Sequence, residues 1–166
     1  TNIPYYLYQD KNYMPSKEII QSQISSYLNE ELFFCTKSFV DFPAFQVTQK
    51  NVVTSSIINN DEVVLNVNYP LSIKKGDLTF NLKDFNNIKL PIRLGVIYNA
   101  TNEILKLNDK NSICISCIVA LGIQNDLSIE LSHYKNDEVI FYIMDNKSII
   151  YNNHYEFRFI NKYQVI

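Results

Sequence analysis

Two stretches of the chain, residues 45–84 and 126–160, alternate apolar with polar side chains, and this alternation limits the fold more than any other feature. Residues 65–69 read LNVNY and residues 155–159 read YEFRF. A period of two places apolar side chains on one face of a β-strand and polar side chains on the other. Residues 78–82, LTFNL, are accordingly expected to form a half-buried strand. Each long stretch is therefore predicted to form an antiparallel β-meander.

A helix is predicted over residues 16–36, with Ser16 as its N-cap. Apolar side chains recur at helical spacing along one stripe, which comprises Ile20, Ile24, Leu28, Leu32 and Cys35. Such a stripe is expected to face a core. Polar residues that include Gln21, Ser25 and Asn29 lie on the other side, which we expect to face solvent.

Residues 91–121 form a second helical region of the sequence. Apolar residues share one helical face after Pro91, and an apolar segment then runs from Ile113 to Leu121 and ends at Gly122. The length of that segment fits a buried helix, although a core strand fits it nearly as well. One or two central helices are therefore expected here.

In this order the elements predict an α+β fold, in which an N-terminal amphipathic helix and one or two central helices pack on antiparallel β-meanders. Hydrophobic residues make up 46% of the chain and charged residues 19%, as in a folded globular protein. A length of 166 residues suits one domain, so residues 1–166 are expected to form a single domain. Residues 1–15 are expected to be an extended aromatic segment.

The charge pattern argues against nucleic-acid binding. The net charge is −2, and the longest basic run is Lys74-Lys75. Binding to a phosphate backbone needs a clustered basic face, which these residues do not supply. A membrane-spanning helix needs roughly 20 apolar residues, and no stretch approaches that length.

Sequence signatures of catalysis are missing as well. There is no G-x-S-x-G turn, and three glycines supply no phosphate-binding loop. The two histidines, His133 and His154, stand near predicted strand ends, where a surface position is the ordinary interpretation. No catalytic, cofactor-binding or metal-binding residue is therefore predicted, and the chain is expected not to be an enzyme.

Cys35, Cys114 and Cys117 are the only cluster of reactive side chains. A disulfide from Cys35 to Cys114 or Cys117 would join the first helix to the central apolar segment, and it is the favoured interpretation. In the chain-entropy model so long a loop is worth roughly 4–5 kcal/mol. The C-x-x-C pair also fits a thioredoxin-like dithiol, a zinc site completed by a histidine, or buried thiols that pack as small hydrophobes.

Two sequons make Asn99 and Asn146 candidate glycosylation sites. Chance alone predicts about two sequons in a chain this rich in Asn, Ser and Thr. Asn146 lies in a predicted turn, which would tolerate a glycan. The sequons therefore remain candidates without further support from the sequence.

Tyrosines crowd the start of the chain, at Tyr5, Tyr6, Tyr8 and Tyr13. The first residue is Thr1, which indicates either that a signal or anchor was removed or that the chain is a fragment. The tyrosines are candidate contacts to a membrane surface or to another subunit, and packing on the domain or an edge strand is the simpler interpretation. An unpaired edge in this segment would allow strand addition by another subunit.

Three stretches together carry a family resemblance: YLNEELFFC at 27–35, VVLNVNYPLSIKKGD at 63–77 and DNKSIIYNNHYEFRFINKY at 145–163. They resemble uncharacterised, N-terminally anchored, pilin-like surface proteins of small-genome archaea, in which a membrane helix precedes a soluble domain. No such helix is present in this sequence. The resemblance implies an envelope location and supplies no reaction and no catalytic residue.

The sequence leaves two main functional hypotheses. In the first, the chain is a non-enzymatic extracellular ectodomain of the envelope or of a filament, with a structural or adhesive role and other subunits as partners. It would be held at the membrane only through an anchor outside this sequence. In the second, it is a cytoplasmic thiol-redox or zinc-binding protein that uses Cys114 and Cys117. An unassigned binding module is the remaining possibility.

Overall fold

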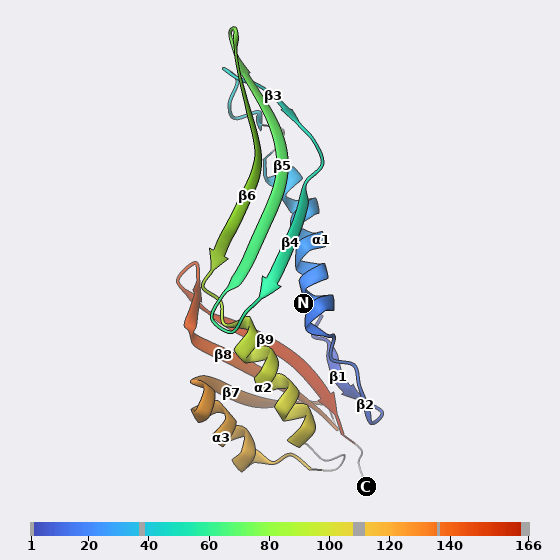
Figure 1. Cartoon of the computed structure of the whole chain (residues 1–166). Coiled ribbons are helices and arrows are strands. Elements are labelled where there is room, and N and C mark those ends of the chain that lie inside the picture. Colours follow the sequence, from blue (N-terminus) through green and yellow to red (C-terminus); the bar gives the residue numbers. More distant parts are fainter. Residues whose placement is uncertain (1, 37–38, 108–111, 136, 164–166) are drawn as a thin grey trace. The chain divides into compact units, whose positions relative to one another are not determined.

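The structure is a computed structural model that describes residues 2–36, 39–107, 112–135 and 137–163. The chain divides into two compact units (Figure 1). That residues 1–166 form a single domain stays a prediction. Unit 1 comprises residues 1–15, 59–62 and 91–166, and unit 2 comprises residues 16–58 and 63–90. The chain therefore passes from one unit to the other four times, and each unit is built from segments distant in sequence.

The described residues of unit 2 form one helix and four strands. These are α1 (Lys17–Cys35), β3 (Gln46–Gln49), β4 (Val53–Ile58), β5 (Val63–Lys75) and β6 (Leu78–Leu90). Strand β6 pairs antiparallel with the whole of β5. Strands β4 and β3 pair with successive parts of β5, at residues 63–68 and 71–74, so they share its other edge.

Local sequence explains the long β5–β6 hairpin. Lys75 pairs with Leu78, which leaves Gly76 and Asp77 as a two-residue loop. Gly76 has a φ of 59°, the positive value that favours glycine at the first position of a tight hairpin loop. Pro70 lies where the β5–β6 register shifts, between residues 68 and 71, and proline is tolerated at such a bulge because it has no N–H to donate.

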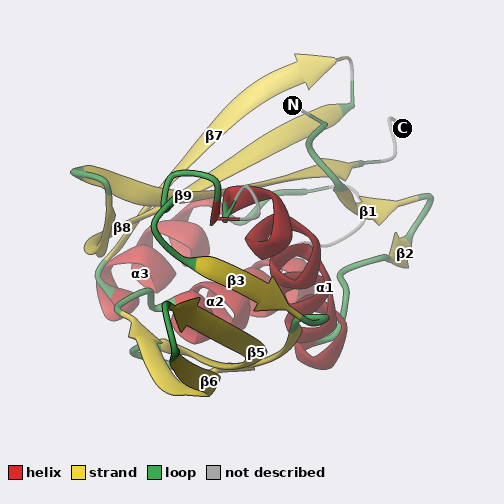
Figure 2. Ribbon diagram, turned by 90° about the horizontal axis from the view of Figure 1, so that it is seen from above, coloured by secondary structure: helices red, strands yellow, loops and turns green. Residues whose placement is uncertain are grey.

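In unit 1, the part of the chain that the structure describes forms a five-stranded sheet with two helices. Its elements are β1 (Tyr5–Tyr8), β2 (Lys11–Asn12), α2 (Leu94–Leu107), α3 (Ile115–Asn125), β7 (Leu127–Lys135), β8 (Glu138–Ile150) and β9 (Asn153–Lys162). The strand order is β2-β1-β9-β8-β7, and Figure 2 shows the larger strands side by side. Strands β7, β8 and β9 are antiparallel neighbours, whereas β1 pairs with β9 in parallel.

Helix α2 carries the apolar face that builds the core of unit 1. Its Ile97 and Ile104 are fully buried against the sheet, where Phe141 and Phe159 stack with ring centroids 4.8 Å apart. Helix α3 adds Ile118 to the same core. The seven-residue spacing of Ile97 and Ile104, two helical turns, follows the helical periodicity expected for residues 91–121.

Gly122 lies inside α3 and does not end it, contrary to the sequence-based expectation. A Cβ at Gly122 would lie 2.9 Å from the carbonyl oxygen of Leu127, so the glycine permits a close approach of α3 to the start of β7. The helix ends three residues later, where Asp126 adopts a left-handed conformation with a φ of 56°.

Strand β8 contains an irregularity built around a buried ion pair. The register against β9 shifts between Asp145 and Ile149, where a turn was predicted; the turn lies instead at 151–152. The Asp145 carboxylate accepts hydrogen bonds from Arg93 Nε at 3.1 Å and from Ser148 Oγ at 2.5 Å. Ser148 Oγ in turn accepts from the Arg93 backbone N–H, so this network joins the segment before α2 to β8.

These observations correct the predicted α+β fold class of helices on antiparallel meanders. Strands account for 48% of the described residues and helices for 29%, so this part of the protein is mostly β. The first element is strand β1, which starts at Tyr5, and the predicted helix follows it as α1. Strand β1 pairs with β9 in parallel, whereas the strands of a meander are antiparallel. No helix among the described residues has the length and apolar character needed to cross a membrane.

Candidate functional site

The outer edge of β6 is the longest unpaired strand edge among the described residues of unit 2. Among the described strands, β6 pairs only with β5, so its other edge has no strand beside it. An unpaired edge presents a row of backbone N–H and C=O groups, which is a template for a strand from another chain. With 13 residues, β6 is longer than most strands of globular proteins.

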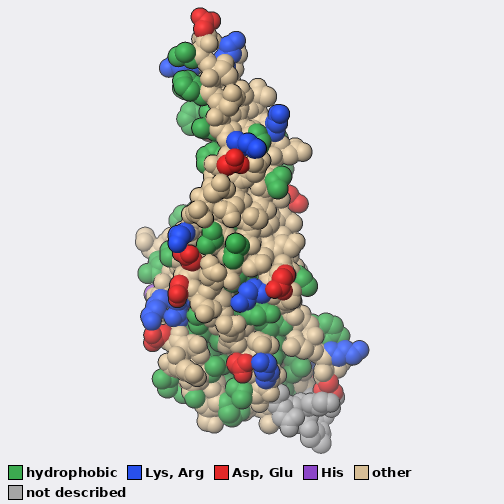
Figure 3. Space-filling model, viewed as in Figure 1, with side chains coloured by type: hydrophobic (Ala, Val, Ile, Leu, Met, Phe, Trp, Pro, Cys, Tyr) green, Lys and Arg blue, Asp and Glu red, His purple; other side chains and the backbone are tan. Residues whose placement is uncertain are grey.

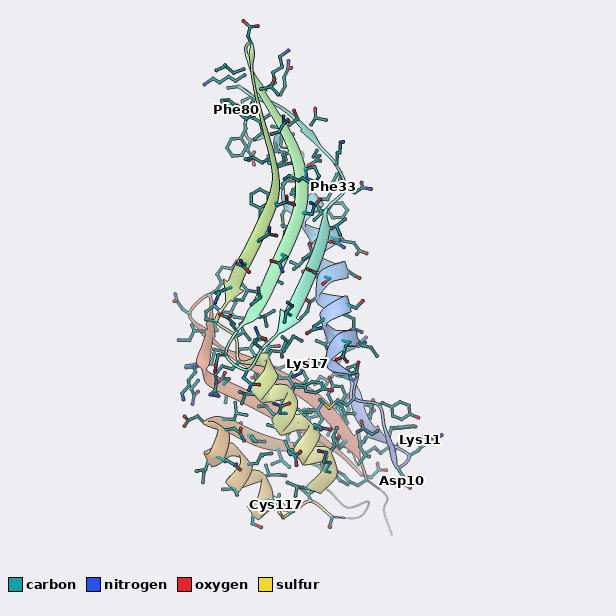
Figure 4. The ribbon with its side chains drawn as sticks, in the orientation of Figure 1. Asp10, Lys11, Lys17, Phe33, Phe80 and Cys117 are labelled. Carbon is teal, nitrogen blue, oxygen red and sulfur yellow. A yellow bond between two sulfur atoms is a disulfide. The ribbon has the colours of Figure 1, made fainter. Side chains whose placement is uncertain are left out.

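The side chains of β6 are unusually apolar for an exposed strand. Leu78, Phe80 and Leu82 recur at every second position and are 64%, 57% and 46% exposed. Figure 3 shows hydrophobic side chains on this side of the upper part of the molecule, and Figure 4 labels Phe80 there. The alternation at 78–82 was expected to mark a half-buried strand, but every residue of β6 before Leu90 is exposed. A contiguous exposed apolar surface is typical of an interaction site.

The opposite edge of the same sheet is closed by helix α1. Asn29 Oδ1 accepts a hydrogen bond from the Thr54 backbone N–H at 2.7 Å, and Gln21 Oε1 accepts one from the Ile58 N–H at 2.9 Å. Ser25 Oγ also lies 3.3 Å from Ser56 Oγ. The polar side of α1, expected to face solvent, therefore faces β4. Covering an edge in this way prevents further strand pairing along β4. Among the described strands, the remaining unpaired edges of this sheet are therefore the long edge of β6 and the outer edge of the four-residue β3.

The predicted apolar stripe of α1 is only half buried, and its last member, Cys35, is exposed. No residue of α1 is fully buried. Phe33 and Phe34 are exposed near the end of the helix, with ring centroids 5.9 Å apart. Cys35 is a free thiol. The expectation that Cys35 lies on a buried stripe and pairs with Cys114 or Cys117 is therefore wrong.

The disulfide of this chain joins Cys114 to Cys117. Cys114 is the N-cap of α3, and its Sγ accepts from the Cys117 backbone N–H at 3.3 Å. Both residues are half buried. Among the described residues there is no group of three His, Cys, Asp or Glu side chains placed to hold a metal ion. The geometry at α3 is thus that of a C-x-x-C pair at a helix N-terminus.

The N-terminal tyrosines divide into one core residue and three surface residues. Tyr6 is 5% exposed and stacks on Phe159 with ring centroids 5.2 Å apart; burial raises the pKa of its phenol to about 12. Tyr6 is therefore unsuited to contact a subunit or membrane. Strand β1 pairs with β9 on one edge and β2 on the other, so among the described residues of this segment only the two-residue β2 has an outer edge without a partner strand.

Tyr5, Tyr8 and Tyr13 line an open pocket with Glu138, with a volume of about 460 Å³. Tyr5 donates a hydrogen bond from its phenol to Glu138 Oε2 at 3.0 Å. Burial, together with this carboxylate, raises the pKa of Tyr5. Glu138 is a nearly buried acid at the start of β8, and sequence reasoning did not single it out. Its proximity to Tyr5 depends on tertiary pairing across 133 residues, for which no local pattern exists.

Both candidate glycosylation sites have an exposed asparagine and a buried hydroxyl. Asn99 is exposed on α2, and Thr101, the third residue of its sequon, is fully buried and bonds to the Ile97 carbonyl. Asn146 is exposed in the irregular part of β8, and its sequon ends at the buried Ser148. The structure therefore presents both asparagines to solvent while it uses the sequon hydroxyls internally.

Comparison of the chain with protein-family models, with curated proteins and with solved structures finds no match.

Proposed function

We propose that this chain is a non-enzymatic ectodomain of the cell envelope or of a surface filament, with a structural or adhesive role. The observation that carries the proposal is the open, apolar edge of β6. Backbone groups of an added strand would satisfy the N–H and C=O groups of β6, and apolar side chains at alternate positions would provide the buried area. The Cys114–Cys117 disulfide supports an oxidising compartment, where such bonds persist. The resemblance to pilin-like surface proteins supports the same location.

The partner that best fits the β6 edge is β6 of a second copy. In an antiparallel pair centred between Lys83 and Asp84, each Lys83 lies opposite Asp84 of the other copy. Leu82 then lies opposite Phe85, which matches apolar to apolar. Opposite charges and apolar side chains placed directly across two strands each stabilise the pair. Both charged residues are exposed on β6, so they are accessible to such a partner. The contact would join copies in pairs about a two-fold axis.

Sedimentation equilibrium of the full chain tests this assembly. We expect a concentration-dependent dimer. Leu82→Lys should abolish it, because the substitution places an ammonium group in the apolar row of Leu78, Phe80 and Leu82. Asn81→Lys is the matched control, because it adds the same charge at the neighbouring position in the polar row, and it should still dimerise. A monomer at every accessible concentration, or equal effects of the two variants, would contradict the proposal.

A second function, thiol redox chemistry, is favoured by one observation: Cys114 caps the N-terminus of α3. A helix N-terminus stabilises a thiolate and so lowers a thiol pKa. Under this hypothesis the chain would reduce insulin in the presence of a dithiol, and Cys114→Ser would abolish that activity while Cys35→Ser would not. Equal activity of the wild type and Cys114→Ser would exclude it.

A further inference from the structure

The pocket formed by Tyr5, Tyr8, Tyr13 and Glu138 combines three aromatic rings with one carboxylate. None of these residues belongs to β6, so the proposed assembly does not involve them. All of the pocket residues belong to unit 1: the tyrosines come from the β1–β2 hairpin and Glu138 from the start of β8. Figure 4 labels Asp10 and Lys11 at the tip of this hairpin. The hairpin brings three aromatic side chains to one acid.

Two backbone features bring the tyrosine rings together. The register of β1 against β9 shifts between Tyr5 and Leu7, and this irregularity breaks the strict alternation of side chains. The rings of Tyr5 and Tyr8, three residues apart, consequently meet edge to face with centroids 5.5 Å apart. Gln9 and Asp10 both have positive φ, the conformation of a tight two-residue hairpin loop.

The tight loop returns the chain so that Tyr13 lies beside β1. The Tyr13 backbone N–H donates to the Tyr6 carbonyl at 2.8 Å, which fixes the position of Tyr13 relative to the strand. The Tyr13 side chain is about half exposed and completes the aromatic lining of the pocket. The lining is therefore set by backbone hydrogen bonds and does not depend on a flexible side chain alone.

Glu138 belongs to a charged group of one ammonium and two carboxylates. Lys162 Nζ lies 3.4 Å from Glu138 Oε1 and 3.5 Å from Asp137 Oδ2, so one ammonium faces two carboxylates. Burial alone would lower the pKa of Lys162, but these carboxylates outweigh it and raise the pKa. The Glu138 side chain is only 7% exposed, which leaves its charge poorly solvated. A poorly solvated carboxylate beside aromatic rings favours a cation.

The position of Lys162 illustrates the chemistry that the pocket accommodates. Its Nζ lies 5.6 Å from the centroid of the Tyr8 ring, within the range of a cation–π contact. The chain itself therefore already places an ammonium between a carboxylate and a tyrosine at the border of the pocket. Tyrosine faces and a single carboxylate are the groups that recognise organic ammonium ions.

We propose that this pocket binds a small organic ammonium cation, with the rings of Tyr5, Tyr8 and Tyr13 around the cation and the Glu138 carboxylate as its counter-charge. The ligand class comprises trimethylammonium compounds and alkylamines, which carry a delocalised or compact positive charge on an apolar body. Inorganic cations fit less well, because the pocket offers aromatic faces where such ions need several oxygen ligands.

Titration of the full chain with choline, followed by NMR of isotope-labelled tyrosine rings, tests the proposal. We expect saturable shifts of the Tyr5, Tyr8 and Tyr13 signals, and no shifts of Tyr27 or Tyr151, which are exposed elsewhere on the chain. The matched ligand control is 3,3-dimethylbutan-1-ol, which has the shape of choline without its charge. An equal response to this neutral alcohol, or no saturable response to choline, would overturn the proposal.

Variants separate the pocket from general surface binding. Tyr8→Leu and Glu138→Gln should each weaken choline binding by roughly 3- to 30-fold, the range of one cation–π or charge contact. Tyr27→Leu is the control and should bind as the wild type does. Lys162→Met removes the competing ammonium and should tighten binding several-fold; weaker binding in that variant would count against the pocket. Glu138→Gln retains the shape of the side chain, and Tyr8→Leu remains informative if Glu138→Gln is unstable.

Vesicles distinguish the two sources of such a cation. If the same three tyrosine signals respond to phosphatidylcholine vesicles as well as to free choline, the ligand is a lipid headgroup. If only free choline shifts them, the ligand is a soluble amine. Either result supports the ammonium site, whereas a response to vesicles that Tyr8→Leu does not change would contradict it.

Discussion

The side chain of Asn29 takes the place of a neighbouring strand for Thr54. Its Oδ1 accepts a hydrogen bond from the outward-pointing Thr54 N–H of β4 at 2.7 Å. About two helical turns earlier in α1, Gln21 makes the equivalent bond to the Ile58 N–H. Helix α1 thereby closes one edge of the unit 2 sheet through polar groups. Since β5 is paired on both edges, the described residues leave two other strand edges of this sheet without a partner strand, the long edge of β6 and the outer edge of the four-residue β3.

Removal of an α1 side chain that closes this edge should destabilise the protein measurably. Gln21→Ala would leave the Ile58 N–H without its acceptor, and a lost hydrogen bond to a partly buried donor costs about 1–2 kcal/mol. Gln23→Ala is the matched control, because Gln23 is exposed on the same helix, and it should change stability by less than about 0.5 kcal/mol. Urea unfolding of both variants gives the comparison. Equal free energies of unfolding would show that α1 does not close the edge.

The buried ion pair of unit 1 should contribute far more than the exposed one. Asp145→Asn removes the charge that compensates Arg93, and loss of one partner of a buried pair costs about 3–5 kcal/mol. Asp126→Asn removes the partner of Lys147 in an exposed pair, where the expected cost is below about 1 kcal/mol. Asparagine also tolerates the left-handed conformation of residue 126, so this control leaves the end of α3 intact. Thermal unfolding that ranks the two variants in the opposite order would contradict the structure.

The cysteines should react as one free thiol and one short-range disulfide. Without reductant, a thiol reagent should modify Cys35 alone, and mass spectrometry should show Cys114 and Cys117 joined within one peptide. Because the bond closes a loop of only four residues, the double variant Cys114→Ser/Cys117→Ser should lose at most about 2 kcal/mol in the chain-entropy model. Recovery of a peptide that links Cys35 to either partner would overturn this assignment.

Stability should fall at alkaline pH as buried phenols ionise. Burial raises the pKa of Tyr6 and of Tyr163 to about 12, whereas an unfolded tyrosine ionises near 10. The folded state therefore holds these protons more tightly, so their stabilising contribution is complete below pH 10 and is lost as the pH rises toward 12. Denaturant unfolding at a series of pH values measures the decline. Tyr6→Phe should reduce its slope, and an unchanged slope would show that Tyr6 is not the responsible group.

Local patterns in the sequence were sufficient to locate most elements. Helix α1 begins and ends within one residue of the range predicted from Ser16 and the apolar spacing. The strands β7, β8 and β9 fill the predicted range 126–160 because their alternation is a local property. The register shift after Asp145 escaped prediction, since it depends on the buried contact with Arg93, more than 50 residues away.

Features that depend on tertiary pairing could not be read from the sequence. The parallel contact of Tyr5 with Ile160 joins the two ends of the chain, and no turn or periodicity indicates it. Polarity alone assigned Asn29 to solvent, because the sequence does not show that a strand edge would need its oxygen. The C-x-x-C spacing of Cys114 and Cys117 is visible in the sequence. The larger stabilisation that the chain-entropy model gives a long loop favoured a disulfide to Cys35, which the structure does not form.

Alternation also failed to predict exposure at β6. The pattern of Leu78, Phe80 and Leu82 is the same whether the covering layer belongs to this chain or to another. In this chain the residues are uncovered, which is the basis for the proposed assembly.

The most direct test of that assembly is amide hydrogen exchange of β6, measured by NMR at low and high protein concentration. Alternate amides of β6 bond to β5 and should be protected at every concentration, which provides an internal control. The remaining amides point outward and should exchange freely in dilute protein and become protected as the concentration rises. Exchange of these outward amides that is independent of concentration would contradict the account.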